Sequence, residues 1–200
     1  MGVRHTAVAA FAAQFVLLAF CSTASSSAAC PGDSAQPTTA SAYDAATALV
    51  CDINVYRAGN GLRPLRWDGQ LWSAAQAHAT DMAARQYASH FTPEGVGLVE
   101  RVEATGYIPK GSNWFLAENL GWGTSYLSTP FAIVQGWIDS PEHRENILDP
   151  QVRDIGVGIA QGSISDGGQS GLIYVADFGM HATPVDTLRI RGRAVRSRRR

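Results

Sequence analysis

The sequence predicts an α+β domain, in which helices come first and paired strands follow near the end of the chain. Helical patterns recur through the first two thirds, whereas a two-residue alternation begins at residues 155–159. A second strand is expected at residues 172–178, joined to the first by a glycine-containing hairpin loop at residues 162–171. Helices followed by adjacent strands are typical of α+β folds, not of alternating parallel sheets.

Two long helices are predicted at the start of the folded part. The first covers residues 43–58, and a Gly-Asn-Gly turn ends it. Its apolar stripe consists of Leu49, Ile53 and Tyr56. The second covers about residues 70–87, and Asp68 is its expected N-cap. Its buried stripe consists of Leu71, Ala75, His78 and Met82.

Three shorter helices are predicted after these two. Residues 96–105 form one helix, which Gly106 ends. The Thr129-Pro130 pair opens the next with an N-cap and a first-turn proline. Its expected apolar stripe consists of Phe131, Val134 and Ile138. The Ser140-Pro141 pair repeats the start signal, so the chain is expected to turn sharply there.

The two ends of the chain are predicted to lie outside the folded domain. Residues 1–29 have the basic start, short apolar run and small-residue stretch of a secretory signal, so we expect a secreted, extracellular protein. The alternatives are a short membrane anchor or a lipoprotein signal at Cys21 or Cys30. Residues 30–42 are a Ser/Thr/Pro lead segment, and residues 43–182 are the domain. Residues 183–200 are an Arg-rich tail, predicted to be disordered because it has no apolar stripe to bury.

Export determines how the cysteines are interpreted. Removal of the signal leaves Cys30 and Cys51, an even pair in an oxidising compartment. We therefore expect a Cys30–Cys51 disulfide that pins the lead segment to the first helix. Such a bond would contribute about 3 kcal/mol in the chain-entropy model. The alternative is two free thiols.

Charge is segregated along the chain. Residues 30–188 hold 8 Lys and Arg against 17 Asp and Glu, whereas residues 189–200 hold seven Arg and no acid. An acidic body of this kind is not expected to bind nucleic acid. The tail is expected to contact anionic envelope polymers or lipid head groups. The alternative is that the tail is a dispensable extension.

Common catalytic signatures are absent from the sequence. It contains no GxSxG nucleophile elbow, no phosphate-binding GxxxxGK, no HExxH and no CxxC. Four histidines remain after the signal. His78 is expected to be a hydrogen-bonded core residue, and His181 is expected to be exposed beyond the last strand.

His90, Glu118 and His143 are the residues whose positions suggest a shared site. His90 follows the second long helix, and His143 lies in the first turn of the helix that Ser140-Pro141 opens. A helix N-terminus favours the neutral imidazole, the form that binds a metal or accepts a proton. Glu118 lies in an apolar, glycine-containing segment, where an acid is normally paired. Spacing alone leaves open a shared site or three separate local hydrogen-bonding residues.

At these residues the sequence resembles a bacterial member of the CAP superfamily, also called the SCP domain. This superfamily groups cysteine-rich secretory proteins, insect antigen 5 and plant pathogenesis-related proteins. The matching segments occur in order over about residues 46–179. They are residues 54–57 with 61–65, residues 77–83, Ser89-His90, Gly106-Tyr107, Ala117-Glu118-Asn119-Leu120-Gly121, residues 137–148, Asp154-Ile155-Gly156-Val157-Gly158 and Tyr174-Val175-Ala176-Asp177-Phe178-Gly179.

The resemblance implies a three-layer α-β-α sandwich with a central antiparallel sheet. It also implies a cleft lined by two histidines and two glutamates, able to bind zinc or another divalent metal. By motif these are His90, His143 and Glu118, but Ser140 occupies the position of the second glutamate. Asp139 and Glu142 are its nearest substitutes. We therefore expect a three-residue metal site, with water in the fourth position of a tetrahedral zinc.

The resemblance implies a secreted, non-enzymatic binding module. Its expected ligands are a divalent metal and a small lipid, a sterol or a cell-envelope component. One alternative is a metal-dependent hydrolase, a protease or esterase of the envelope, because a zinc-bound water is acidified to a pKa of about 7. Another is a structural or adhesive envelope protein that binds through its Arg tail.

Overall fold

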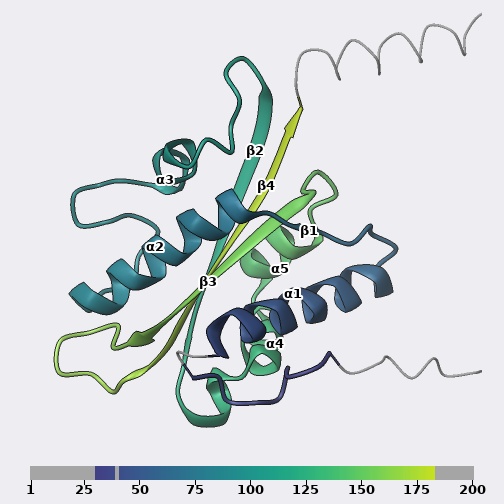
Figure 1. The fold of residues 1–200 in the computed structure, drawn as a ribbon. Helices are drawn as coiled ribbons and strands as arrows, with labels where there is room; N and C mark the ends of the chain where they lie inside the picture. The colour runs from purple at the N-terminus through teal and green to yellow at the C-terminus, as the bar shows by residue number, and fades with distance from the viewer. Residues whose placement is uncertain (1–29, 39–40, 183–200) are drawn as a thin grey trace, which may run out of the picture.

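The computed structural model describes residues 30–38 and 41–182, so the predicted signal and tail lie outside the described residues. The α+β prediction is confirmed, because helices pack against one four-stranded, mainly antiparallel sheet in a single layered domain (Figure 1). The elements are α1 (Ala42–Gly59), β1 (Arg66–Trp67), α2 (Gly69–Arg85), α3 (Leu98–Ala104), β2 (Asn113–Gly123), the 3-10 helix η2 (Ser125–Ser128), α4 (Pro130–Asp139), α5 (Pro141–Leu148), β3 (Asp154–Gly162) and β4 (Gly171–Ala182).

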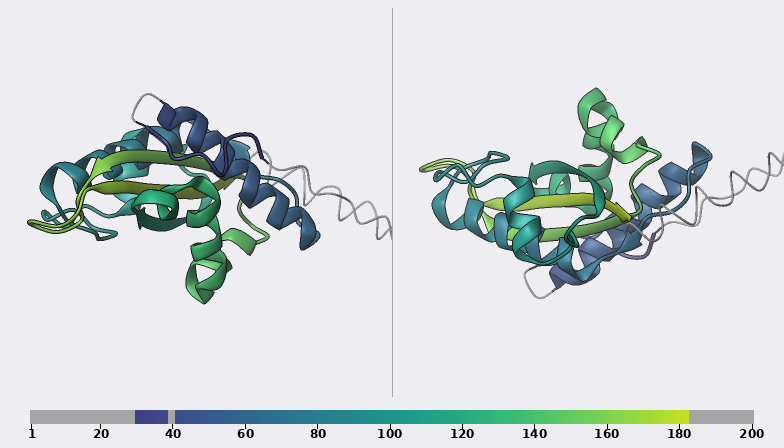
Figure 2. Two further views of the ribbon diagram at one scale, coloured as in Figure 1. Left: turned by 90° about the horizontal axis from the view of Figure 1, so that it is seen from below. Right: turned by 90° about the horizontal axis from the view of Figure 1, so that it is seen from above.

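The sheet has the strand order β1-β3-β4-β2. Strand β4 pairs antiparallel with both β3 and β2, and the two-residue strand β1 runs parallel to β3. Helices lie on both faces of this sheet, as the views from below and above show (Figure 2), which confirms the three-layer arrangement. Within the described residues, no helix has the length and apolar character to cross a bilayer.

Alternating residues of β4 serve two separate cores. Tyr174 and Phe178 are buried with the residues of α1, α4 and α5, whereas Ile173 and Val175 are buried with α2. This two-residue alternation places successive side chains on opposite faces of the sheet. Each fully buried large apolar side chain contributes about 1.5–3 kcal/mol. The central strand is therefore held from both sides.

Close contact between α2 and β3 depends on two glycines. A Cβ atom added at Gly156 would collide with the backbone of Trp72, and one at Gly158 with the backbone of Gln76. Helix α2 therefore lies with its backbone directly against the strand.

The structure differs from the sequence analysis at three points. It contains strand β2, which was not predicted and whose residues 117–119 are all buried. The buried face of α4 is formed by Ile133, Val134 and Trp137, while Phe131 is 48% exposed. His181 lies within β4 and is half-buried, with its ring edge-on to Tyr107 at a centroid distance of 4.9 Å.

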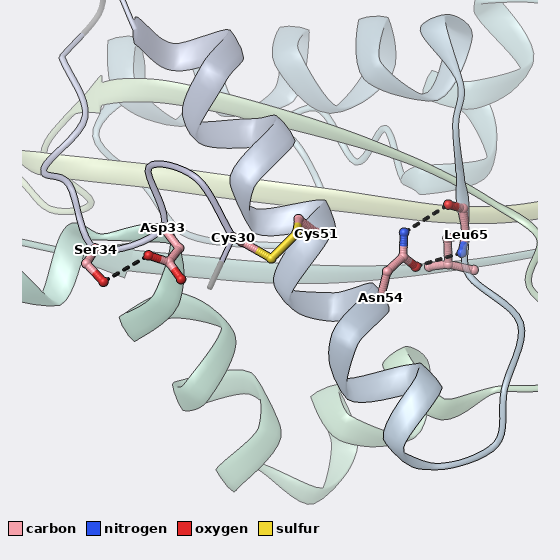
Figure 3. The surroundings of a disulfide bond; sticks show 6 residues. All are labelled: Cys30, Asp33, Ser34, Cys51, Asn54 and Leu65. Carbon is pink, nitrogen blue, oxygen red and sulfur yellow. Dashed lines mark hydrogen bonds between the residues drawn. A yellow bond between two sulfur atoms is a disulfide. The ribbon is translucent and has the colours of Figure 1, made fainter. Parts of the chain in front are cut away.

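The predicted Cys30–Cys51 disulfide is present and joins the lead segment to α1, with a Cα–Cα distance of 5.8 Å (Figure 3). The lead segment is also attached to α4, because the Phe131 backbone N–H donates to the Asp33 carbonyl at 3.0 Å. Figure 3 also shows Asn54 of α1, whose side-chain amide forms two hydrogen bonds with the backbone of Leu65. The middle of α1 is thus tied to the lead segment at Cys51 and to the chain before β1 at Asn54.

We predict that Gly158→Ala destabilises the domain by about 3 kcal/mol, because the added methyl group has no room against the backbone of α2. Gly136→Ala in α4 is the matched control. A Cβ there meets nothing within 4 Å, so this change should stabilise the protein by about 0.5–1 kcal/mol. Urea unfolding measures both values. Equal stability of the two variants would contradict the close packing of α2.

We predict that stability falls as the pH rises, because burial and then the nearby Asp33 carboxylate raise the pKa of Asp52 to about 7. The folded state therefore binds this proton more tightly than the unfolded state does, and the advantage is lost as the pH rises through 7. The free energy of unfolding should therefore fall between pH 5 and pH 8, and Asp52→Asn should remove about 1–2 kcal/mol of that fall. This value is reduced for solvent screening, because Asp52 is half-buried.

The measurement is urea unfolding at pH 5 and pH 8. Asp44→Asn, at an exposed acid on the same helix, is the control and should keep the wild-type difference between the two pH values. If the free energy of unfolding changed as much between pH 5 and pH 8 in Asp52→Asn as in the wild type, Asp52 would not be the source of the pH dependence.

Candidate functional site

Glu118 is a buried acid in the middle of β2, and its side chain is only 2% exposed. One carboxylate oxygen, Oε1, accepts a hydrogen bond from Nδ1 of His90 at 2.7 Å. The other oxygen, Oε2, accepts one from the guanidinium of Arg101. The structure thus brings together two of the three predicted site residues, and the acid is paired as its surroundings require.

Arg101, on α3, was not predicted to belong to the site. Its side chain is 8% exposed and contacts Glu118, while its guanidinium also donates to the backbone carbonyl of His90 at 2.9 Å. It therefore holds both partners of the His90–Glu118 pair. The only sequence signal for such a residue is indirect, because a buried glutamate requires a cation from somewhere in the fold.

The loop that carries His90 is ordered by a histidine of α2. Helix α2 ends at Arg85, and its C-cap residue Gln86 adopts a left-handed conformation with a φ of 56°. His78 is 1% exposed, and its Nε2 lies 2.9 Å from the carbonyl oxygen of Ser89, to which it donates. The prediction of a hydrogen-bonded core histidine is confirmed. Its function is to hold the residue next to His90.

His143 is positioned by contacts between α5 and β2. Its backbone carbonyl accepts a hydrogen bond from the amide of Asn119 at 3.0 Å. The Asn119 side chain in turn accepts one from Asn146 of α5 at 2.8 Å. Nδ1 of His143 lies 2.8 Å from Oγ of Ser140, the residue that precedes α5. Ser140, at the position of the family's second glutamate, therefore orients His143.

The electrostatics of the two site histidines differ. The hydrogen bond to Glu118 raises the pKa of His90 above its ordinary value. Burial, and then the charge of His90, lower the pKa of His143. Burial opposes ionisation of Glu118, but the hydrogen bond from His90 and the charge of Arg101 outweigh it and hold its pKa below the usual value. At neutral pH His143 is therefore the more readily available neutral base.

A second buried acid, Asp177, lies beside Glu118 and was not predicted. Asp177 is on β4 directly opposite Glu118 and is 0% exposed. Burial and then the charge of Glu118 raise its pKa well above the usual value, so it remains protonated while Glu118 is charged. The acids proposed as substitutes for the second glutamate, Asp139 and Glu142, are exposed and make no hydrogen bond to these residues in the described chain.

The described residues hold no ready three-ligand metal site, but each site histidine keeps one ring nitrogen without a hydrogen bond among them. Among the described residues, no group of three or more His, Cys, Asp or Glu side chains is arranged to hold a metal ion. Both oxygens of Glu118 already accept hydrogen bonds. Nδ1 of each histidine is engaged, and no hydrogen bond in the described part of the chain uses Nε2 of either ring. The two side chains differ in exposure, because that of His90 is 54% exposed whereas His143 is half-buried.

The comparisons with known proteins agree with this fold. Residues 51–178 match the model of the CAP family, described as the cysteine-rich secretory protein family. The protein YkwD of Bacillus subtilis is 33% identical over 129 residues, which make up 64% of this chain and 47% of YkwD. The chain thus spans about half the length of that relative.

Solved structures of two bacterial proteins share the fold. An extracellular protein of Bacillus anthracis that contains an SCP domain has a TM-score of 0.57 and 25% identity, covering 71% of this chain and 43% of that one. An outer surface protein of Borrelia burgdorferi has a TM-score of 0.54 and 22% identity, covering 67% of this chain and 90% of that one. The latter likeness concerns the fold alone.

We predict that Arg101→Leu destabilises the protein by about 3–5 kcal/mol, because it leaves the Glu118 carboxylate buried without its cation. Adding Glu118→Gln should recover much of this loss. Arg85→Leu is the matched control and should destabilise the protein far less, because the side chains of its partners Asp81 and Glu94 are 33% and 63% exposed. Chemical unfolding measures all four proteins. Similar losses in the two single variants would show that the Arg101–Glu118 pair has no special role.

Proposed function

Because the chain belongs to the cysteine-rich secretory protein (CAP) family, we propose that it is an extracellular, non-enzymatic binding module whose His90 and His143 take up a divalent metal ion such as zinc. The observation that carries the proposal is the His90–Glu118 hydrogen bond at 2.7 Å. It uses Nδ1 and leaves Nε2 of the same ring as the donor atom.

Glu118 acts in this proposal as the carboxylate that orients His90. Histidines that bind metals usually donate their other ring N–H to a carboxylate, which fixes the tautomer and raises the basicity of the ligand. Ser140 supports His143 in the same way through Nδ1. The sequence predicted Glu118 as a direct third ligand, whereas its hydrogen bonds to His90 and Arg101 favour the indirect role.

A zinc ion held by two imidazoles would supply a Lewis-acidic centre with positions open to water or to a partner's oxygen ligand. The chain's own residues favour binding over hydrolysis. A metal-dependent hydrolase needs a free general base, and Glu118, the carboxylate that contacts His90, has both oxygens occupied. Turnover of a peptide or ester library that is lost with a chelator would favour the hydrolase instead.

The other predicted partners are a small lipid or sterol and an envelope component. An apolar pocket of about 140 Å³ lies beside Trp122 and Leu120. This is smaller than the 300–1,000 Å³ that is usual for ligand sites, so it gives a sterol little support. Contact of the Arg tail with anionic envelope polymers or lipid head groups stays a prediction, because residues 183–200 lie outside the described chain.

We predict that the mature protein binds zinc and that His90→Ala and His143→Ala each weaken this binding at least tenfold. Glu118→Gln should weaken it about 10- to 100-fold, as is usual when the partner of a ligating histidine is removed. His181→Ala, at a half-buried histidine on β4, is the control and should bind like the parent. Calorimetric zinc titration gives the affinities, and circular dichroism checks that each variant is folded.

The zinc affinity should fall on acidification, because protons compete with the metal for the imidazoles. Since the pKa of His90 is raised, this loss should begin at a higher pH than for an ordinary histidine. Calorimetry at several values between pH 8 and pH 5 tests this. A flat affinity over that range, or zinc binding unchanged in both histidine variants, would rule out the proposed site.

A further inference from the structure

A groove of about 650 Å³ runs along the outer edge of β3, between the start of α1 and the length of α2. In Figure 1 these two helices lie on either side of β3. Strands β4 and β2 follow β3 in the sheet order, so the groove is separate from the site around Glu118. Its volume lies within the 300–1,000 Å³ that is usual for ligand sites.

Two exposed aromatic side chains flank this groove. Tyr43 of α1 is 60% exposed, and Trp72 of α2 is 38% exposed. The Tyr43 ring is held edge-on by Trp67 at a centroid distance of 5.5 Å. Such rings present large, rigid apolar faces that become covered when a flat, partly apolar ligand stacks on them.

The polar residues that line the groove are neutral. They are Gln76 and Thr80 of α2 and Gln161 of β3. None of the described residues lining the groove carries a charge. An ionic ligand would lose its hydration there without gaining a partner. A neutral ligand with hydroxyl or amide groups would find donors and acceptors.

The backbone edge of β3 is already occupied by a side chain. The amide of Gln76 donates to the Ile159 carbonyl at 2.9 Å and accepts from the Ile159 N–H at 3.1 Å. These are the two hydrogen bonds that an added strand would make with this residue. An extended peptide therefore cannot add to the sheet here without displacing Gln76.

We propose that this groove binds a neutral oligosaccharide. Sugar rings have apolar faces that stack on Tyr43 and Trp72, and their hydroxyl or N-acetyl groups pair with Thr80 and Gln161. The α2 wall from Trp72 to Ala84 is about 18 Å long at the helical rise of 1.5 Å per residue, which accommodates more than one ring. The ligand is thus a glycan chain, not a single sugar.

The test is calorimetric titration of the mature protein with three neutral hexasaccharides, chitohexaose, cellohexaose and maltohexaose. EDTA is present so that metal binding does not contribute. At least one sugar should bind saturably, and Trp72→Ala and Tyr43→Ala should each weaken this binding at least fivefold. Trp122→Ala and Tyr126→Ala are matched controls outside the groove, at residues that are 37% and 73% exposed, and should bind like the parent.

Several results would overturn the proposal. One is the absence of binding by all three sugars at millimolar concentration to a protein that circular dichroism shows to be folded. Another is equal loss of affinity in the groove variants and the controls. Tighter binding of an anionic polygalacturonate, or of an uncharged ten-residue peptide that competes with the sugar, would assign the groove to a different class of ligand.

Discussion

The buried charge of Glu118 is the constraint on which the site depends. A carboxylate that is 2% exposed in the centre of a sheet is stable only when cations and donors surround it. Arg101 supplies the charge from α3, and His90 supplies a hydrogen bond from the loop after α2. One acid on β2 therefore ties together β2, α3 and the loop after α2, and the orientation of His90 follows from it.

Regular residue patterns explain which elements could be predicted. In α2, Leu71, His78 and Met82 are buried at helical spacing, and in β3 branched residues alternate with glycines that contact α2, although residues 154–159 are all buried. The sequence of β2 has no such alternation. Its central residues, among them Glu118 and Asn119, are buried in succession, while Trp122 is exposed. A charged side chain in a buried strand hides the periodicity that the sequence would otherwise show.

The candidate site was foreseen only in part. The resemblance indicated His90, Glu118 and His143, and the structure pairs the first two directly. Arg101 and Asp177 could not be found in this way, because they reach Glu118 through a helix packed on the sheet and through the register of β4 against β2. Such partners are chosen by tertiary packing. Periodicity and local spacing carry no information about them.

The side chain of Gln76 has a consequence for how copies of this domain behave at high concentration. An outer strand with free amides and carbonyls is a template on which identical chains can grow into fibres. Here the middle of that strand is already bonded to an amide from its own domain. Loss of this glutamine side chain would leave the Ile159 N–H and carbonyl free to pair with a strand of another copy, while the core residues stay unchanged.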